Sequence, residues 1–261
     1  MSQPLFYLER LRRETFLRRI EYREELASTN DLALELATRD DVPLPLLVLV
    51  ERQTAGRGRG GHPWWSAAGA LTFSILIDID RERLAPERRP LVSLTTALAI
   101  GEALELLVPD ADIGLKWPND VLPQSRKVCG VLLESPSHPV GRMVVGIGLN
   151  VNNSFALAPA ELQQKATSLS NAAPRNLDLT DVLILVLQRF ADLFERLTTH
   201  RLNLRERWTP RCVLTGRLVQ LQVGRQSVSG ICRGIDDRGA LLLDTPSGLE
   251  RCHSGTVCQV T

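Results

Sequence analysis

The sequence lacks any marked imbalance of charge. Its 261 residues hold 31 lysines and arginines against 30 aspartates and glutamates, which gives a formal net charge of +1 at pH 7. A chain without a basic surplus has no overall field that draws in nucleic acid or an acidic membrane surface. We therefore expect no DNA and no membrane among its partners.

Long hydrophobic runs are also missing. No apolar stretch reaches the roughly 18 residues that a membrane-spanning helix needs. The first 25 residues are crowded with charge, which is unlike a signal peptide. These absences predict a soluble protein of the cytoplasm.

Cysteine is scarce and shows no pattern. The five cysteines are odd in number and form neither a C-x-x-C pair nor a metal-binding spacing. Such usage is typical of reduced thiols in a cytosol. The remaining composition, with 44% hydrophobic and 23% charged residues, is ordinary for a globular chain and is enough for one large domain and a small one.

What the chain does contain is a glycine-rich segment at residues 51–66, ERQTAGRGRGGHPWWS. Its glycines let the backbone turn N–H groups toward a ligand, and Arg57 and Arg59 add fork-shaped cationic donors. The spacing also fits the G-x-G-x-x-G fingerprint of dinucleotide-binding folds, but Pro63 follows where that fold begins a helix, which argues against it. A flexible linker is the other alternative. Two arginines and two tryptophans in so short a stretch favour an anion-binding loop.

A second polar segment lies at residues 114–121, GLKWPNDV. Pro118 ends regular structure and leaves Lys116, Asn119 and Asp120 on a tight turn. A plain turn explains Pro-Asn-Asp by itself. The three polar side chains also offer a phosphate donor, an amide that bonds either way, and a carboxylate for metal or proton chemistry.

Two strands are predicted downstream, at residues 127–134 and 142–152, joined as a hairpin. Glycine weakens a strand unless something lies close against its backbone. A bulge explains any one of these glycines equally well, whereas three of them favour a thin ligand resting on the sheet face: Gly130, Gly146 and Gly148.

Hydrophobic spacing predicts the rest of the regular structure. Residues 5–26 interleave arginine and glutamate with apolar positions, as in one exposed helix or two short ones, and residues 28–31 supply N-cap side chains for the helix that follows. A buried strand is expected at residues 70–78, and helices are expected at residues 90–108 and 178–204, the latter capped by Thr180. After Cys212 the pattern changes to five short strands, which indicates a small barrel.

Several of these segments occur together in one known family. The chain carries Ser28-Thr29-Asn30, QTAGRGRGG at residues 53–61 with Trp64, KWPND at 116–120, RKVCG at 126–130 and GIGLN at 146–150. This ordered set resembles the motifs of biotin protein ligases, and residues 213–260 resemble the SH3-like C-terminal domain of that family. Each motif alone is weak to moderate, but their common order and spacing are highly specific.

The resemblance implies an α+β fold of two domains. Residues 1–211 would form a catalytic domain akin to class II aminoacyl-tRNA synthetases, with a mixed β-sheet and helices, and residues 212–261 a small SH3-like β-barrel. It also implies a reaction in which biotin and ATP, with Mg²⁺, give biotinyl-5′-AMP and pyrophosphate. The biotinyl group then passes to a lysine of a biotin carboxyl carrier protein domain, in acetyl-CoA carboxylase or a related carboxylase. Such a reaction brings two anions together, so the protein must supply positive charge and alignment.

The resemblance also assigns roles to individual residues. Catalytic charge would come from Arg57, Arg59 and Lys127. Biotin would be held by Ser28, Thr29, Asn30, Gln53, Gly56, Arg57, Gly58, Arg59, Lys127, Gly130 and Gly146. ATP would be held by Arg57, Arg59, Trp64, Lys116, Asn119, Asp120 and Asn150, with Trp64 stacked on adenine and Asn150 reading its edge. The metal ligands are left open.

The sequence departs from the family at three places. His62 stands where arginine or lysine is usual, and an ordinary histidine is mostly neutral at pH 7, which argues against a phosphate contact there. Ala67 follows Ser66 where the family has proline. Only 27 residues precede Ser28, too few for the winged helix-turn-helix of members that bind an operator. We therefore expect a monofunctional ligase without repressor function.

Two other functions stay open at this point. Lipoate or octanoate attachment uses the same fold, although the RGRG loop and KWPND favour biotin. A binding module that retains biotinyl-AMP without transferring it is a further alternative. The chain is compatible with a monomer or a homodimer. We also expect the loop at residues 56–61 to be mobile without ligand and ordered by biotin or biotinyl-AMP, because its four glycines lose much entropy on closure.

Overall fold

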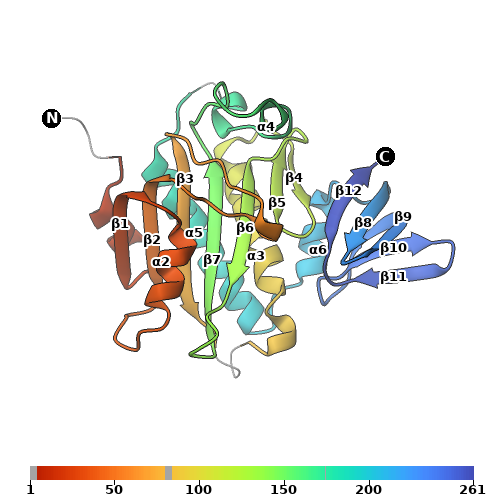
Figure 1. Cartoon of the computed structure of the whole chain (residues 1–261), viewed down its shortest axis with the longest axis horizontal. Helices are drawn as coiled ribbons and strands as arrows, with labels where there is room; N and C mark the ends of the chain where they lie inside the picture. The colour runs from red at the N-terminus through yellow and green to blue at the C-terminus, as the bar shows by residue number, and fades with distance from the viewer. Residues whose placement is uncertain (1–4, 80–83, 174) are drawn as a thin grey trace.

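The strands of the protein form two separate sheets in a computed structural model that describes residues 5–79, 84–173 and 175–261 (Figure 1). The larger sheet has seven strands in the order β1-β2-β3-β7-β6-β5-β4, and the smaller has five in the order β11-β10-β9-β8-β12. Strands β1 and β2 run parallel, whereas the other neighbours in the larger sheet are antiparallel. The predicted α+β fold with a mixed sheet and a small all-β unit is confirmed.

The centre of the larger sheet is buried on both faces. Its strands are β1 (Arg19–Leu26), β2 (Leu46–Gln53), β3 (Ala70–Asp78), β4 (Ile113–Lys116), β5 (Asp120–Pro123), β6 (Cys129–Glu134) and β7 (Arg142–Asn150). Because both faces of β2, β3 and β7 are covered, these strands are nearly continuous apolar runs. Strand β3 pairs with β7 without interruption from Ala70 opposite Asn150 to Asp78 opposite Arg142. This register fixes where each β7 residue faces.

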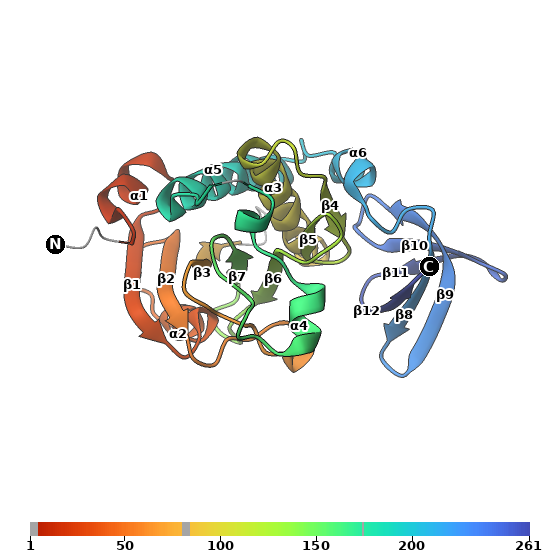
Figure 2. The ribbon, with the colours of Figure 1, turned by 90° about the horizontal axis from the view of Figure 1, so that it is seen from above.

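Helices cover the two faces of this sheet unequally (Figure 2). On one face lie α1 (Leu8–Glu14), α3 (Leu91–Leu107) and α5 (Leu179–Thr198). On the other, α2 (Thr29–Leu36) lies over β2, β3 and β7, where Ala33 and Leu36 share a small core with Val48 and Val144. Since α2 is short, the adjoining part of this face is left to the loop between β2 and β3.

The expected helix over residues 5–26 is wrong in its second half. Helix α1 ends at Glu14, and residues 19–26 form the edge strand β1, paired in parallel with β2. An edge strand can expose alternating arginine and glutamate, and Arg19 pairs with Glu21 two residues away at 2.5 Å instead of one helical turn away. Ile20 and Tyr22 pack against the core. Pairing with β2 therefore overrode the local helix pattern.

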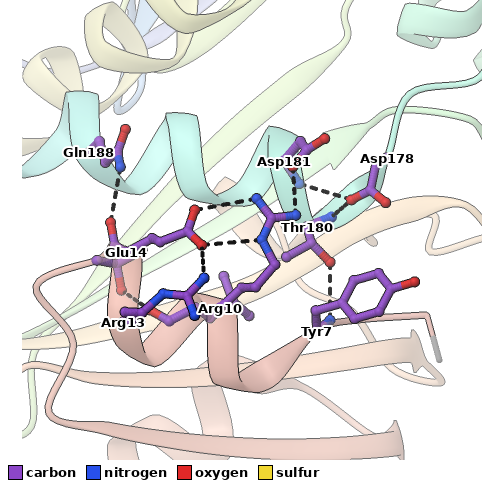
Figure 3. A network of polar contacts seen from close by, with 10 residues as sticks. Tyr7, Arg10, Arg13, Glu14, Asp178, Thr180, Asp181 and Gln188 are labelled. Carbon is purple, nitrogen blue, oxygen red and sulfur yellow. Dashed lines mark hydrogen bonds and ion pairs between the residues drawn. The ribbon is translucent and has the colours of Figure 1, made fainter.

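The N-cap of helix α5 lies two residues earlier than the sequence predicted. Its cap is Asp178, whose Oδ1 accepts hydrogen bonds from the backbone N–H of Thr180 at 2.8 Å and of Asp181 at 3.0 Å. The Thr180 hydroxyl instead accepts a bond from the Tyr7 N–H at 3.1 Å, and Arg10 reaches Asp181 at 2.9 Å (Figure 3). These contacts attach α1 to α5, so the predicted cap residue serves in tertiary packing.

The C-terminal unit contains the five strands that the sequence predicts. After α4 (Ala160–Lys165) and α6 (Leu204–Trp208), the chain forms β8 (Leu218–Val223), β9 (Gln226–Ile235), β10 (Leu241–Thr245), β11 (Gly248–Cys252) and β12 (Thr256–Val260). Every neighbouring pair in this sheet is antiparallel. A boundary at residue 211/212 remains a prediction.

The small unit is attached to the large one through the β9–β10 turn. The Trp117 indole N–H donates to the Gly239 carbonyl at 3.0 Å in a buried contact. A Cβ on Gly239 would lie only 2.6 Å from Leu94 and 2.7 Å from Leu91, and its φ of +77° also suits glycine. The turn therefore packs directly against α3 and the β4–β5 hairpin.

Within the described ranges, no helix is both long and apolar enough to cross a membrane. The five cysteines are all free thiols, of which Cys258 alone is exposed.

Candidate active site

A cavity lies on the face of the larger sheet that α2 covers only in part. The segment between β2 and β3 crosses in front of β7 and β6 and forms its outer wall (Figure 1). The cavity holds about 1040 Å³ of empty space, part of it open to solvent. It gathers these sequence-predicted residues: Ser28, Thr29, Asn30, Gln53, Arg57, Gly58, Arg59, Trp64, Lys116, Asn119, Asp120, Lys127, Gly130 and Gly146.

The floor of the cavity depends on two glycines of β7 that face the same side. A Cβ on Gly146 would lie 2.0 Å from Asn30 Oδ1, and a Cβ on Gly148 would lie 2.2 Å from the Trp64 ring. Neither distance is possible for a real side chain, so each glycine is needed for another residue to rest on the sheet. The sequence favoured a thin ligand resting on these glycines, whereas in the structure Asn30 lies against Gly146 and Trp64 against Gly148. Any ligand lies above or beside them.

The end of the cavity beyond Gly146 is built from neutral hydrogen-bonding groups. Gln53 Oε1 accepts from the Thr29 backbone N–H at 2.6 Å and from its hydroxyl at 3.0 Å. Ser74 donates from its buried hydroxyl, which lies 2.7 Å from Thr29 Oγ1 and 2.6 Å from Asn30 Oδ1. Sequence reasoning missed Ser74, although a serine in the middle of the apolar strand ALTFSILID was a usable signal. This end offers amide and hydroxyl groups without net charge.

Arg57 lies at the neutral end but is matched by carboxylates. Its guanidinium donates to both oxygens of Glu134, each at 2.9 Å, and to Asp31 at 2.5 Å. The hydrogen bonds that Arg57 donates to Glu134 raise the pKa of its guanidinium, and the bond that it donates to Asp31 adds to the effect. Asp31 and Glu134 were not predicted from the sequence. Their two negative charges exceed the single positive charge of the first loop arginine.

Arg59 lies at the opposite end and has a different surrounding. It donates to Asn119 Oδ1 at 3.2 Å and to the Gly255 carbonyl of the C-terminal unit at 3.3 Å. Burial lowers the pKa of its guanidinium, with the charge of Asp120 opposing that shift. Asn119 is fixed in turn, because its amide donates to the Val131 carbonyl at 2.7 Å. Among the described residues, Arg59 forms no ion pair.

Lys127 stands beside Arg59 at the same end. Its Nζ lies 2.6 Å from Asp120 Oδ1, and it also lies 3.0 Å from where a Gly130 Cβ would be. Glycine at 130 therefore leaves room for the lysine to cross the strand. Regular structure begins at Cys129, two residues later than predicted, because the Lys127 N–H bonds to the Lys165 carbonyl at 2.9 Å. Lys116 also lines the cavity here.

The loop that carries both arginines is itself a tight hairpin. The Gly58 N–H donates to the His62 carbonyl at 2.7 Å, and Arg57 bridges Pro63. Gly60 and Gly61 have φ values of +65° and +78°, which only glycine adopts readily. His62 lines the cavity with an exposed side chain.

Two predicted site residues lie outside the cavity lining. A Cβ on Gly56 would lie 2.7 Å from Gln53 Nε2 and 2.9 Å from the Trp64 carbonyl, so this glycine serves packing beneath the loop. Asn150 is buried, and its Oδ1 accepts from Asn153 at 3.1 Å. Sequence reasoning missed other residues that do line the cavity, notably Thr72 of β3 and Thr256 and Val257 of β12.

Comparison with known proteins gives two family models that match the chain. The biotin/lipoate A/B protein ligase family matches residues 22–152, and the biotin protein ligase C terminal domain matches residues 215–258.

Individual relatives match over most of the chain. It is 34% identical over 226 residues to the biotin-acetyl-CoA-carboxylase ligase of Paracoccus denitrificans, covering 85% of this chain and 92% of that protein. It is 31% identical over 250 residues to the bifunctional ligase/repressor BirA of Bacillus subtilis, covering 95% of this chain and 76% of that protein. Among solved structures, the biotin protein ligase from Aquifex aeolicus in complex with biotin and ATP gives a TM-score of 0.80 at 28% identity, covering 94% of this chain and 99% of the other.

Proposed function

The chain belongs to the biotin/lipoate A/B protein ligase family, and we infer from that membership and from its cavity that it is a biotin protein ligase. It activates biotin with ATP as biotinyl-5′-AMP and passes the biotinyl group to a carrier lysine. The match to the biotin protein ligase C terminal domain and the named relatives favour biotin over lipoate or octanoate.

One observation carries this proposal: a single cavity joins a neutral amide-and-hydroxyl end to a cationic end. Biotin has an uncharged ureido ring at one end and a carboxylate at the other, whereas ATP is anionic. Thr29 and Gln53 are suited to the first group, and Arg59 and Lys127 are suited to the charged ones.

In the first step, a biotin carboxylate oxygen attacks the α-phosphorus of ATP, and the bond to pyrophosphate breaks. Two anions must approach one another, so fixed positive charge is the main requirement. We assign that charge to Arg59 and Lys127. Arg57 serves differently, because Glu134 and Asp31 already neutralise it.

In the second step, the ε-amine of a carrier lysine attacks the carbonyl carbon of the mixed anhydride. The bond between that carbon and the phosphate oxygen breaks, AMP leaves, and the amine loses a proton. The same cations stabilise the leaving phosphate. We propose that the acceptor is a biotin carboxyl carrier domain of acetyl-CoA carboxylase, as the name of the Paracoccus relative indicates.

Adenine would stack on Trp64, whose ring packs against Gly148 and whose indole N–H is buried. Lys116, Asn119 and Asp120 stand on the hairpin at the same end and would contact the nucleotide. We retain Asn150 as an adenine contact through its strand-end position, although the cavity lining does not include its side chain.

The cavity offers few protein ligands for the Mg²⁺ that accompanies ATP. Asp120 is the carboxylate that lines it, and Lys127 already pairs with that group at 2.6 Å. No cluster of three His, Cys, Asp or Glu side chains able to hold a metal is found in the described part of the chain. An ion arriving with ATP would be held chiefly by phosphate oxygens.

Pyrophosphate release tests the proposal when biotin, lipoate and octanoate are offered separately with ATP. We expect release with biotin alone, followed by label on a carrier domain. Equal release with lipoate or octanoate would contradict the substrate assignment. Release without transfer to any carrier domain would favour a module that retains biotinyl-AMP.

A further inference from the structure

Glu134 lies at the end of β6 and is not part of the cavity lining, yet it holds two residues that are. Its two carboxylate oxygens accept from Arg57, each at 2.9 Å. Its Oε2 also accepts from the Asn30 amide at 2.7 Å. The Glu134 side chain is only 25% exposed, compared with 39% for Arg57. Glu134 is therefore the point where the loop and the cavity floor meet.

The contacts of Glu134 continue without a break into the neutral end of the cavity. Asn30 accepts from Ser74 at 2.6 Å, and Ser74 lies 2.7 Å from Thr29 Oγ1. Asn30 also lies against Gly146, so it has little freedom to turn. A movement of the loop at Arg57 must therefore break bonds that belong to the same network as the biotin-facing groups.

A bidentate contact to a carboxylate does not suit a residue meant to bind phosphate. Two negative side chains already surround Arg57, so a further anion there would meet their repulsion. The geometry is instead that of a salt bridge that ties the loop to the end of β6. Arg59, at the other side of the same loop, has carbonyl partners and no carboxylate at hydrogen-bonding distance among the described residues.

We propose that Glu134 is a positioning residue which, through Arg57, holds the glycine-rich loop closed over the biotin end of the cavity and so retains activated biotin until a carrier lysine arrives. This inference rests on the proposed function. A residue that acts this way affects where the biotinyl group goes more than how fast it is activated.

Loss of retention has a defined chemical consequence. Biotinyl-AMP that leaves the cavity reacts with the ε-amine of any exposed lysine: a carbon–nitrogen bond forms, the carbon–oxygen bond to phosphate breaks, and AMP and a proton are released. Water can attack the same carbon and gives biotin and AMP. Label on a bystander protein, divided by pyrophosphate formed, therefore measures escape independently of how much enzyme is active.

The test compares Glu134→Gln with the unaltered chain, using serum albumin as bystander and no carrier domain. We expect the ratio of albumin label to pyrophosphate to rise about fivefold, as for the loss of one bidentate charged contact on a partly exposed loop. Asp192→Asn is the matched control, because it breaks an ion pair of 2.9 Å with Arg196 on α5, on the other face of the sheet. It should leave the ratio unchanged.

A double variant distinguishes loss of the Arg57–Glu134 salt bridge from a general loss of structure. Arg57→Ala should raise the ratio by the same factor, and Arg57→Ala with Glu134→Gln should raise it no further, because both act on one contact. Glu134→Asp, which keeps the charge, should give a smaller rise than Glu134→Gln.

Several results would overturn the inference. An unchanged ratio in Glu134→Gln would show that Glu134 does not retain activated biotin. If the double variant shows a higher ratio than Arg57→Ala alone, by the factor seen for Glu134→Gln alone, Glu134 does not act through Arg57. A rise in the Asp192→Asn control would show that the ratio reports general loosening. If the unaltered chain forms no pyrophosphate from biotin and ATP, the proposed function fails instead, and the two failures are thereby distinguished.

Discussion

The two ends of the cavity differ in how their charge is balanced. At Gly146, the single cation Arg57 faces two carboxylates, and the remaining groups are amides and hydroxyls bonded to one another. At Gly148, Arg59 and Lys127 face the single carboxylate Asp120. Negative charge is therefore in excess at the first end, whereas positive charge is in excess at the second.

This difference shows that two arginines two residues apart in one loop need not share a task. Arg57 and Arg59 are indistinguishable in composition and in motif, but the register of the loop turns them to opposite ends of the cavity. In the proposed function, the Arg57 end would surround the neutral ring of biotin, and the Arg59 end would provide positive charge to phosphate.

The largest effect is expected for Arg59→Ala. Removing charge-assisted bonds of about 1.5–3 kcal/mol each should lower pyrophosphate release about 100-fold. Arg57→Ala is the comparison variant and should lower pyrophosphate release less than about tenfold. The Arg57 side chain is partly exposed, and carboxylates already compensate its charge. The measurement is single-turnover pyrophosphate release with saturating biotin and ATP. Equal losses in the two variants would contradict the division between them.

The floor glycines give a reciprocal pair of variants. Gly148→Ala would place a Cβ 2.2 Å from the Trp64 ring, and Gly146→Ala would place one 2.0 Å from Asn30 Oδ1. Overpacking costs of about 1–3 kcal/mol predict a KM for ATP raised about 30-fold in the first variant and a KM for biotin raised by a similar factor in the second. The other KM should change less than about threefold in each case. If both variants weaken both substrates alike, the two ends are not separate.

Lys127→Ala should lower adenylate formation about tenfold and leave the fold intact. Lys127 contributes charge beside Asp120 and crosses the strand at Gly130, but it has no place in the hydrophobic core. Lys165→Ala is the control, since that lysine pairs with Glu161 on an exposed helix face. Circular dichroism checks the fold. Normal turnover by the purified Lys127 variant would remove this residue from the mechanism.

The sequence predicted most of the fold because its local signals agreed with the tertiary result. The apolar run at residues 70–78 and the helix ending at Leu107 were both located correctly. Strand β1 was missed, since an exposed edge strand and an exposed helix carry the same arginines and glutamates. Only the pairing with β2 distinguishes them, and that pairing depends on a segment more than twenty residues away.

The candidate site was predictable as a list of residues but not as an arrangement. Glycine and arginine spacing located the loop, yet nothing in it indicated that Arg57 would meet Glu134, which is 77 residues further along the chain. Asp31 looked like part of a helix cap, and Ser74 looked like part of a buried strand. Contacts made between segments distant in sequence are set by the sheet register, which no local pattern encodes.

The smallest effect concerns the loop between the two ends. The structure gives the loop polar anchors at Arg57 and Arg59, so its closure does not depend wholly on a ligand. Fixing a flexible residue costs about 1–2 kcal/mol, and partly exposed ion pairs return only part of that, which leaves an open population for trypsin to cleave.

Trypsin cleavage after Arg57 and Arg59 should therefore slow about threefold with saturating biotin and ATP, because ligand phosphate adds a contact at Arg59 that only the closed loop can make. Arg225 is the internal reference, since it lies exposed on the β8–β9 turn beside Gly224 and does not line the cavity. Its cleavage rate should not change with ligand. If both loop sites are cut equally fast with and without substrates while the Arg225 site is also unchanged, the anchors at Arg57 and Arg59 already hold the loop as firmly as the ligand does, and ligand-driven closure is wrong.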